Sequence, residues 1–420
     1  MTHHSVKLVG TGESSGGLRA VSLVVALALA GGIAAPVAHG HAREPRGSLV
    51  SVHRVAALDR DGVARWLRGQ DMEAGAGRYG VRAYRLTYRT LDPHGRPTTA
   101  TGLLTLPDGP RHRLRLVSDT HGTMVDRAYA PSVGDDIGRV PSYLHASAGA
   151  AVAAPDYLGL GRGPGTHPYM DTASSVTASL DMLRAARHAV GRLGRSLSGD
   201  VYATGFSQGG QVAMALGATL QTGGDRHFRL RALAPVSGPY DLSGVEVPAL
   251  FDGRVNDTSG LLYASYLLAA QNRLHPLWKD PRDVFRAPYD RRVEALYDSE
   301  HTEEDVFKAL PGSVRELLTP SYAAQMRRPT GALKRMLAAN DGACAWKPDV
   351  PVRLYASAGD TDVPIGNARS CVARLRENGV ERSVPVLDQG AVDHFGGFRK
   401  AAPQVVRWFA SLASASASAG

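Results

Sequence analysis

Short apolar runs alternate with longer stretches of helical periodicity over most of the chain. The runs lie at residues 114–117, 150–154, 201–204, 230–236, 352–356 and 384–387. They lack sustained in-and-out alternation, as expected of strands that are buried on both faces. Apolar residues at helical spacing from Thr172 to Arg192, and again after Gly209, predict helices between strands. The pattern therefore predicts a mostly parallel sheet with helices on both faces.

Two segments depart from this alternation. Apolar and β-branched residues at 84–88 and 99–106 flank the turn Asp92-Pro93-His94-Gly95, which predicts an antiparallel hairpin at one edge of the sheet. Between residues 242 and 346 the strand signals stop and only helical patterns remain. A helical insertion of this length between two strands predicts a lid over the carboxyl edge of the sheet.

The amino-terminal segment carries the pattern of a secretory signal peptide. An almost unbroken apolar run from Val21 to Ala35 follows Arg19 and leads into small residues near Ala42. The run is shorter than the roughly 20 residues that a membrane-spanning helix needs, and an uncleaved anchor is the alternative. We therefore expect residues 1–42 to be a signal peptide and the protein to be secreted.

The remaining residues divide into two core segments, a lid and a tail. We expect residues 43–241 and 347–412 to form the two parts of the α/β core, and residues 242–346 to form the lid. Residues 413–420 alternate Ser and Ala with nothing to bury, which predicts a disordered tail.

The composition narrows the function class. Apolar residues make up 43% and charged residues 21% of the 420 residues, which excludes disordered, collagen-like and multi-span membrane proteins. The net charge of +9 comes from scattered arginines without a basic tract, so we expect no nucleic-acid partner. Pro164 stands where a dinucleotide fingerprint after Gly159 and Gly161 would need its third glycine, and no His-Glu-x-x-His motif is present. We expect neither a cofactor nor a metal.

The only two cysteines are Cys344 and Cys371. In an exported protein, two cysteines can oxidise to each other, because the compartment does not keep thiols reduced. We expect them to form a disulfide; two buried free thiols are the alternative.

The sharpest chemical motif is Gly205-Phe206-Ser207-Gln208-Gly209, which fits the pattern Gly-x-Ser-x-Gly. It follows a predicted strand and precedes a predicted helix, the context that a nucleophile elbow requires. The two glycines allow the neighbouring backbone to approach closely, while the strained turn presents the serine hydroxyl to a substrate. We expect Ser207 to be a nucleophile.

A serine hydroxyl needs a base to take its proton and an acid to orient that base. His394 follows the last predicted strand, where its loop ends at the carboxyl edge of the sheet. The acid is expected after the preceding strand, in Gly359-Asp360-Thr361-Asp362-Val363-Pro364. We choose Asp362, because Asp360 is better placed to bond within the turn, and keep Asp360 as the alternative.

Other residues after the predicted strands are candidates for binding. The Gln208 amide, at a helix N-terminus, and the amide of Thr123 or Gly122, after strand 114–117, are the expected oxyanion donors. Four further side chains are candidates for the substrate side of the site, each with a structural role as the alternative: His121, Asp156, Tyr157 and Tyr240.

The chain order Ser207, Asp362, His394 is that of the α/β-hydrolases. The elbow, the turn Asp156-Tyr-Leu-Gly-Leu-Gly161, the segment His167-Pro168-Tyr169 and the acid loop together resemble the secretory lipase family of that superfamily, over residues 84–412. The resemblance implies an eight-stranded hydrolase sheet, a lid between its sixth and seventh strands, and ester hydrolysis without a cofactor. It also implies the nucleophile, acid and base at the three positions above.

We therefore expect a secreted serine hydrolase that cleaves carboxylic esters through an acyl-enzyme. The substrate is a small-molecule or lipid ester, so a lipase and a carboxylesterase both stay open. The apolar cluster at 261–268 favours a lipid chain, and the lid's own packing against the sheet is an equal alternative. Transient contact with a lipid interface is a further expectation. A serine peptidase whose lid residues Glu303, Glu304 and Asp305 hold a substrate amine is the alternative. A non-catalytic binding protein of the same fold is a further alternative, and the oligomeric state stays open.

Overall fold

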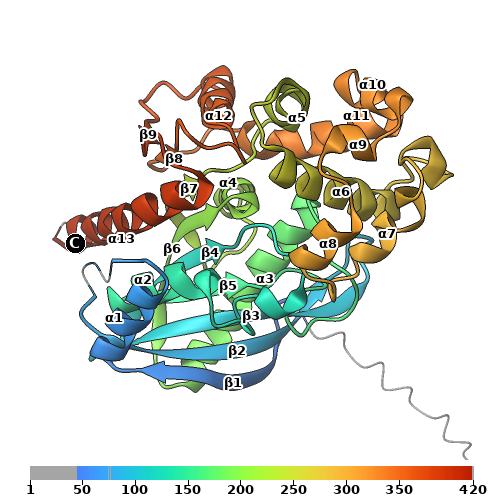
Figure 1. Cartoon of the computed structure of the whole chain (residues 1–420). Coiled ribbons are helices and arrows are strands. Elements are labelled where there is room, and N and C mark those ends of the chain that lie inside the picture. Colours follow the sequence, from blue (N-terminus) through green and yellow to red (C-terminus); the bar gives the residue numbers. More distant parts are fainter. Residues whose placement is uncertain (1–44, 74, 76, 419–420) are drawn as a thin grey trace, which may run out of the picture. The chain divides into compact units, whose positions relative to one another are not determined.

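The computed structural model describes residues 45–418, apart from residues 74 and 76. Within this range nine strands form one mixed sheet in the order β1-β2-β3-β5-β4-β6-β7-β8-β9 (Figure 1). The strands are β1 (Leu49–Leu58), β2 (Gly80–Leu91), β3 (Pro97–Asp108), β4 (Arg113–Thr120), β5 (Ala151–Pro155), β6 (Ser196–Phe206), β7 (Arg229–Val236), β8 (Leu354–Ala356) and β9 (Val386–Asp388). The signal peptide expected at residues 1–42 lies outside the described residues.

The sheet confirms the predicted architecture and adds one strand to it. β2 and β3 form the predicted antiparallel hairpin, β3 pairs antiparallel with β5, and every pair from β5 through β9 is parallel. The prediction of eight strands is wrong, because β1 pairs antiparallel with β2 at the edge. His53 and Arg54 interrupt its apolar residues and none of its residues is fully buried, so its sequence differs from that of a central strand.

Helices cover both faces of this sheet. On one face lie α1 (Arg60–Gly69), α2 (Val140–Ser147) and α13 (His394–Ser418), and on the other lie α3 (Thr172–Arg192), α4 (Gln208–Gln221) and α12 (Gly366–Glu377). Adjacent residues of one strand enter different cores: Leu116 of β4 packs with α3, whereas Val117 packs with α2. The apolar runs therefore lack alternation because both faces of each strand are buried.

The carboxyl-terminal helix differs from the prediction at both ends. The sequence pattern predicts a helix only from Pro403 to Leu412, but α13 begins at His394 and continues to Ser418. The predicted disordered tail is therefore helical as far as residue 418. Alanine has the highest helix propensity, so a Ser-Ala repeat can prolong a helix although it has no apolar face to bury.

The segment between β7 and β8 contains helices and turns, as predicted. It comprises η3 (Leu242–Glu246, a π-helical turn), α5 (Val247–Asp252), α6 (Asp257–Leu274), η4 (Pro281–Asp283), η5 (Tyr289–Arg291), α7 (Val293–Leu296), α8 (Glu303–Ala309), α9 (Val314–Leu317), α10 (Pro320–Arg327), α11 (Gly331–Asn340) and η6 (Asp341–Cys344). Two more 3₁₀ turns, η1 (Arg127–Tyr129) and η2 (Ile137–Arg139), follow β4. In Figure 1 the yellow and orange helices of this lid lie together on one side of the sheet.

The lid has a hydrophobic core of its own. Helix α6 lies at its centre, and the apolar cluster at 261–268 packs there against Phe285, Leu317 and Leu337. This packing accounts for the cluster without a lipid chain. Among the described residues, no helix is long and apolar enough to cross a membrane.

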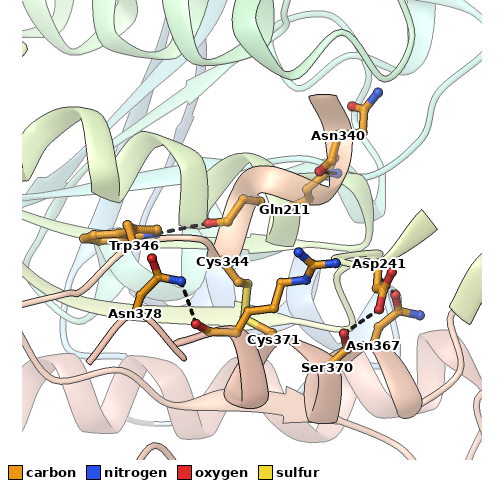
Figure 2. The surroundings of a disulfide bond; sticks show 11 residues. Gln211, Asp241, Asn340, Cys344, Trp346, Asn367, Ser370, Cys371 and Asn378 are labelled. Carbon is orange, nitrogen blue, oxygen red and sulfur yellow. Dashed lines mark hydrogen bonds between the residues drawn. A yellow bond between two sulfur atoms is a disulfide. The ribbon is translucent and has the colours of Figure 1, made fainter. Parts of the chain in front are cut away.

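The predicted disulfide is confirmed. Cys344 and Cys371 are bonded with an S–S distance of 2.00 Å, and the bond joins η6, at the end of the lid, to helix α12 of the core (Figure 2). Beside it, the Ser370 hydroxyl donates a hydrogen bond of 2.5 Å to Asp241, at the start of the lid. Both ends of the lid are thus attached to α12.

Replacing both Cys344 and Cys371 by alanine should destabilise the fold. The bond closes a loop with a sequence separation of 27, and loss of such a cross-link raises the entropy of the unfolded chain, which corresponds to about 3.5 kcal/mol. Urea unfolding of the two proteins measures the difference. Wild-type protein unfolded in reductant is the control and should match the variant; equal stability of oxidised wild type and variant would contradict the prediction.

Candidate active site

Ser207 occupies a strained turn between β6 and α4. Its backbone angles are φ 57° and ψ −127°, a conformation that non-glycine residues rarely adopt. A Cβ on Gly209 would lie 1.9 Å from the Thr120 carbonyl oxygen, and one on Gly205 would lie 2.2 Å from the Thr120 hydroxyl. The tight backbone packing therefore requires glycine on both sides of the serine, as the motif predicts.

His394 pairs with Asp360, and not with Asp362 as predicted. Its Nδ1 lies 2.7 Å from Asp360 Oδ2, and both side chains are buried. The other carboxyl oxygen of Asp360 accepts hydrogen bonds from the Asp362 and Val363 amides, each 2.9 Å long. The turn contacts therefore do not compete with the histidine contact, because they use the opposite oxygen of the same carboxyl group.

Asp362 turns instead toward the lid. Its carboxyl oxygens accept hydrogen bonds from three side chains at the start of α6: Asn256 Nδ2 at 2.7 Å, Ser259 Oγ at 2.9 Å and Tyr263 OH at 3.1 Å. The choice of Asp362 as the partner of His394 is thus wrong in this structure, and Asp362 joins the acid loop to the lid.

The second ring nitrogen of His394 remains available. Nε2 has no hydrogen-bond partner among the described residues, and the imidazole, which is 3% exposed, packs against the Phe206 ring with centroids 4.5 Å apart. Ser207 and His394 line the same cavity. A carboxylate on Nδ1 holds the proton there and leaves a lone pair on Nε2, which is the atom that can accept a hydroxyl proton.

The predicted oxyanion donors surround Ser207. Gln208 is the first residue of α4, so its amide has no carbonyl partner one turn earlier in the helix. A Cβ on Gly122 would lie 3.2 Å from Ser207 Cβ, so the backbone of the loop after β4 passes close to the nucleophile. Thr123 lies in the same cavity wall as Ser207, and its hydroxyl is 2.9 Å from Tyr169 OH.

Two cavities meet at Ser207. The first, here called the lid pocket, has a volume of about 60 Å³ and extends from Ser207 and Gln208 to Leu242, Glu246 and Met326 of the lid. The second, here called the histidine pocket, has a volume of about 400 Å³ and contains His394. Four residues line both pockets: Thr123, Ser207, Tyr263 and Asp362.

The four candidates for the substrate side lie mostly outside these pockets. Asp156 is fully buried and accepts hydrogen bonds from Thr101 Oγ1 and Ser132 Oγ, while the Tyr157 hydroxyl donates to the His121 carbonyl. Neither of them, nor Tyr240, lines either pocket. His121 lines the histidine pocket, but its ring nitrogens face backbone carbonyl oxygens at 2.7 and 3.2 Å. A structural role, given above as the alternative for each of these four residues, therefore describes them better than a role in substrate binding.

Three acidic residues of the pocket walls were missed in the sequence: Glu246, Asp119 and Asp136. Glu246 lies in the wall of the lid pocket, and burial raises the pKa of its carboxyl to about 8. Asp119 lies in the wall of the histidine pocket, and burial raises its pKa to about 7. Asp119 could have been found in the sequence, because it is a charged residue just after the apolar run 114–117. Glu246 lies in a π-helical turn, which no sequence pattern predicted.

Glu246→Gln should stabilise the protein at pH 8 to 9 but not at pH 4. The folded-state pKa of about 8 exceeds the ordinary value of 4.5, so the stabilising effect of the bound proton is full below about pH 4.5 and is lost as the pH rises through about 8. Glutamine cannot lose such a proton, and its side-chain oxygen can still accept the hydrogen bond from Asn367. Melting temperatures across this pH range measure the effect; Glu381→Gln, at an exposed position, is the control. A difference that does not change with pH would contradict the prediction.

In the part of the chain that the structure describes, no three or more His, Cys, Asp or Glu side chains are grouped so as to hold a metal ion.

Comparison of the whole chain with known proteins identifies its family. No family model matches the sequence, and no curated protein matches it. Among solved structures, the rice cell wall degrading esterase LipA from Xanthomonas oryzae is 30% identical, with a TM-score of 0.77 over 86% of this chain and 97% of that chain. A presumed hydrolase from Legionella pneumophila (24% identity, TM-score 0.80, 87% and 98% of the two chains) and Candida antarctica lipase A (13%, 0.60, 84% and 78%) share the fold. The chain belongs to the lipases and esterases of the α/β-hydrolase superfamily.

Proposed function

We propose that the protein hydrolyses carboxylic esters through an acyl-enzyme on Ser207. The observation that carries this proposal is the pairing of His394 Nδ1 with Asp360, which leaves Nε2 unpartnered in the cavity that Ser207 lines. The relationship to an esterase at 30% identity supports the same reaction class.

In the proposed reaction, Ser207 Oγ attacks the ester carbonyl carbon while His394 Nε2 accepts the hydroxyl proton. The carbonyl oxygen becomes an oxyanion that the Gln208 and Thr123 amides stabilise. Collapse of this intermediate breaks the bond to the alcohol oxygen, which takes the proton from Nε2. Water then attacks the acyl-enzyme by the same route, and Asp360 stabilises the imidazolium in both halves.

The two pockets divide the substrate between them. The alcohol oxygen receives its proton from His394, so the alcohol part of the ester lies in the histidine pocket. The acyl part then lies in the lid pocket, beyond Gln208. With a volume of about 60 Å³, the lid pocket fits a short acyl chain better than a long one. We therefore propose a carboxylesterase with a preference for short acyl groups, and not a lipase.

Covalent labelling tests this proposal. A fluorophosphonate probe should modify the wild-type protein at Ser207, as read by mass spectrometry of its peptides, and a series of p-nitrophenyl esters should show highest kcat/KM at acetate to butyrate. Absence of both labelling and turnover would refute the proposed enzymatic function. A maximum of kcat/KM at long acyl chains would refute the proposed preference for short acyl groups.

A serine peptidase on the same fold is the second candidate, supported by one acidic lid residue. Of the three predicted to hold a substrate amine, only Glu303 lines the histidine pocket. Glu304 forms an ion pair with Lys308, and Asp305 caps the start of α8. Turnover of an aminoacyl p-nitroanilide faster than that of the matching ester would favour the peptidase.

We also propose that the protein is secreted. Disulfides persist in oxidising compartments, and the bond between Cys344 and Cys371 agrees with the export signal expected at residues 1–42.

A further inference from the structure

The pockets around Ser207 are lined by acidic side chains, although the chain as a whole is basic. Five acidic residues line them: Asp119, Asp136 and Glu303 in the histidine pocket, Glu246 in the lid pocket, and Asp362 in both. The whole chain carries 48 Lys and Arg against 39 Asp and Glu. Yet within the described range no lysine or arginine lines either pocket. The excess of acidic over basic side chains is therefore a local property of the site.

Two of these carboxyl groups, unlike the other three, have neither a hydrogen-bond nor an ion-pair partner among the described residues. Asp119 is 3% exposed, and its carboxyl oxygens form no hydrogen bond or ion pair with any described residue. Burial raises the pKa of Glu303, which also forms no ion pair within the described part of the chain. A buried carboxylate without a partner is costly, and a cation that enters the pocket removes that cost.

Aromatic side chains form the mouth of the histidine pocket. Tyr129 is 42%, Phe307 38% and Phe395 44% exposed, and all three line this pocket. Single exposed apolar residues are common on protein surfaces, but three exposed rings gathered at one pocket form a patch of the kind that marks a binding site. Phe307 lies four residues after Glu303 on α8, so a carboxyl group and an aromatic ring share one face of that helix.

Carboxylates beside aromatic faces are the combination that binds ammonium groups. We propose that the substrate is an ester of a cationic amino alcohol, with its ammonium group in the histidine pocket between the aromatic side chains and the carboxylates of Glu303 and Asp362. This inference rests on the proposed ester hydrolysis, which places the alcohol part beside His394. Hydrolysis leaves the ammonium group unchanged: water and the ester give the carboxylic acid and the cationic alcohol.

Two esters of nearly equal shape test the inference. Acetylcholine carries a quaternary ammonium, and 3,3-dimethylbutyl acetate replaces that nitrogen with carbon, so the pair differs almost only in charge. At low ionic strength we expect kcat/KM for the cationic ester to exceed that for the neutral ester by about 10-fold. We expect high salt to reduce this ratio.

Glu303→Gln removes one charge at nearly constant shape and should lower the ratio about 5-fold. The matched control is Glu304→Gln, on the neighbouring residue of the same helix, where the exposed carboxylate pairs with Lys308 outside both pockets; its ratio should equal that of wild type. Circular dichroism shows whether each variant is folded. Tetramethylammonium chloride should inhibit hydrolysis of the neutral ester by wild type more than sodium chloride at equal ionic strength.

The outcomes separate this inference from the proposed function. Equal rates on the two esters, with fluorophosphonate labelling of Ser207 intact, would overturn the cation site and leave the esterase. If Glu303→Gln and Glu304→Gln reduced the ratio of cationic to neutral ester hydrolysis equally, the preference would come from the long-range electrostatic field of the protein. That result would also overturn the cation site. If the protein showed neither turnover nor labelling, both the proposed esterase function and this inference would be overturned.

Discussion

Replacing Ser207 by alanine should lower kcat for a p-nitrophenyl ester by about 10⁴- to 10⁶-fold. Removal of the nucleophile leaves only the oxyanion donors and substrate binding, which retain a small fraction of the rate enhancement. Steady-state assays at saturating ester measure the loss, and covalent labelling by a fluorophosphonate should disappear with it.

Ser237 offers a matched control for this variant. It follows β7, the strand next to β6, is also buried, and also has a positive φ, of 47°. It lines neither pocket. Ser237→Ala should therefore retain kcat within a few-fold of wild type, with both variants folded by circular dichroism. Substantial turnover by the Ser207→Ala variant would contradict the proposed mechanism.

Asp360→Asn should lower kcat by about 10⁴-fold with little change in KM. Asparagine presents either an amide donor or a weaker neutral acceptor to His394 Nδ1, so the imidazole loses the tautomer that leaves Nε2 free, and its protonated form loses the stabilising charge. The volume of the side chain hardly changes, and its oxygen can still accept the amide hydrogen bonds of the turn.

Asp362→Asn is the informative comparison for this variant. Asp362 lies two residues away in the same loop, but contacts Asn256, Ser259 and Tyr263 of the lid. With a neutral ester as substrate, we expect kcat of the Asp362→Asn variant to be no more than about tenfold below that of wild type. The reverse ranking, a severe loss at position 362 and a mild one at 360, would show that the loop rearranges in the working enzyme and that Asp362 orients the base.

Most predictions that depended on local pattern agree with the structure; the ends of the carboxyl-terminal helix are the exception. The helix predicted from Thr172 to Arg192 has the same bounds as α3, and the hairpin, the parallel strands and the helical lid lie where the apolar periodicity indicated. The disulfide agrees with there being only two cysteines in a chain for which an export signal is expected. Edge strand β1 was missed because it has one neighbour and partly exposed faces, and because His53 and Arg54 interrupt its apolar residues.

The acid loop shows where pattern reasoning fails. Asp360 and Asp362 have the same chemistry and lie two residues apart, so their spacing to the other motifs cannot rank them. Hydrogen bonding within a turn seemed an argument against Asp360, yet a carboxyl group has two oxygens and Asp360 uses one for the turn and one for His394. The same limit applies to the pocket walls, whose carboxyl groups come from β4, the π-helical turn, α8 and the acid loop.

Sequence alone was sufficient for the layers of the fold and for the strained turn that carries Ser207. Each depends on neighbours within one strand, turn or helix, where burial and backbone sterics act over a few residues. Which aspartate meets His394, how small the lid pocket is, and that both pockets are acidic in a basic chain depend on how α6, α8 and α13 approach the elbow. The contact of His394 with Asp360 joins residues 34 positions apart, and the contacts of Asp362 with α6 join residues about a hundred positions apart. Only the folded chain brings them within hydrogen-bonding distance.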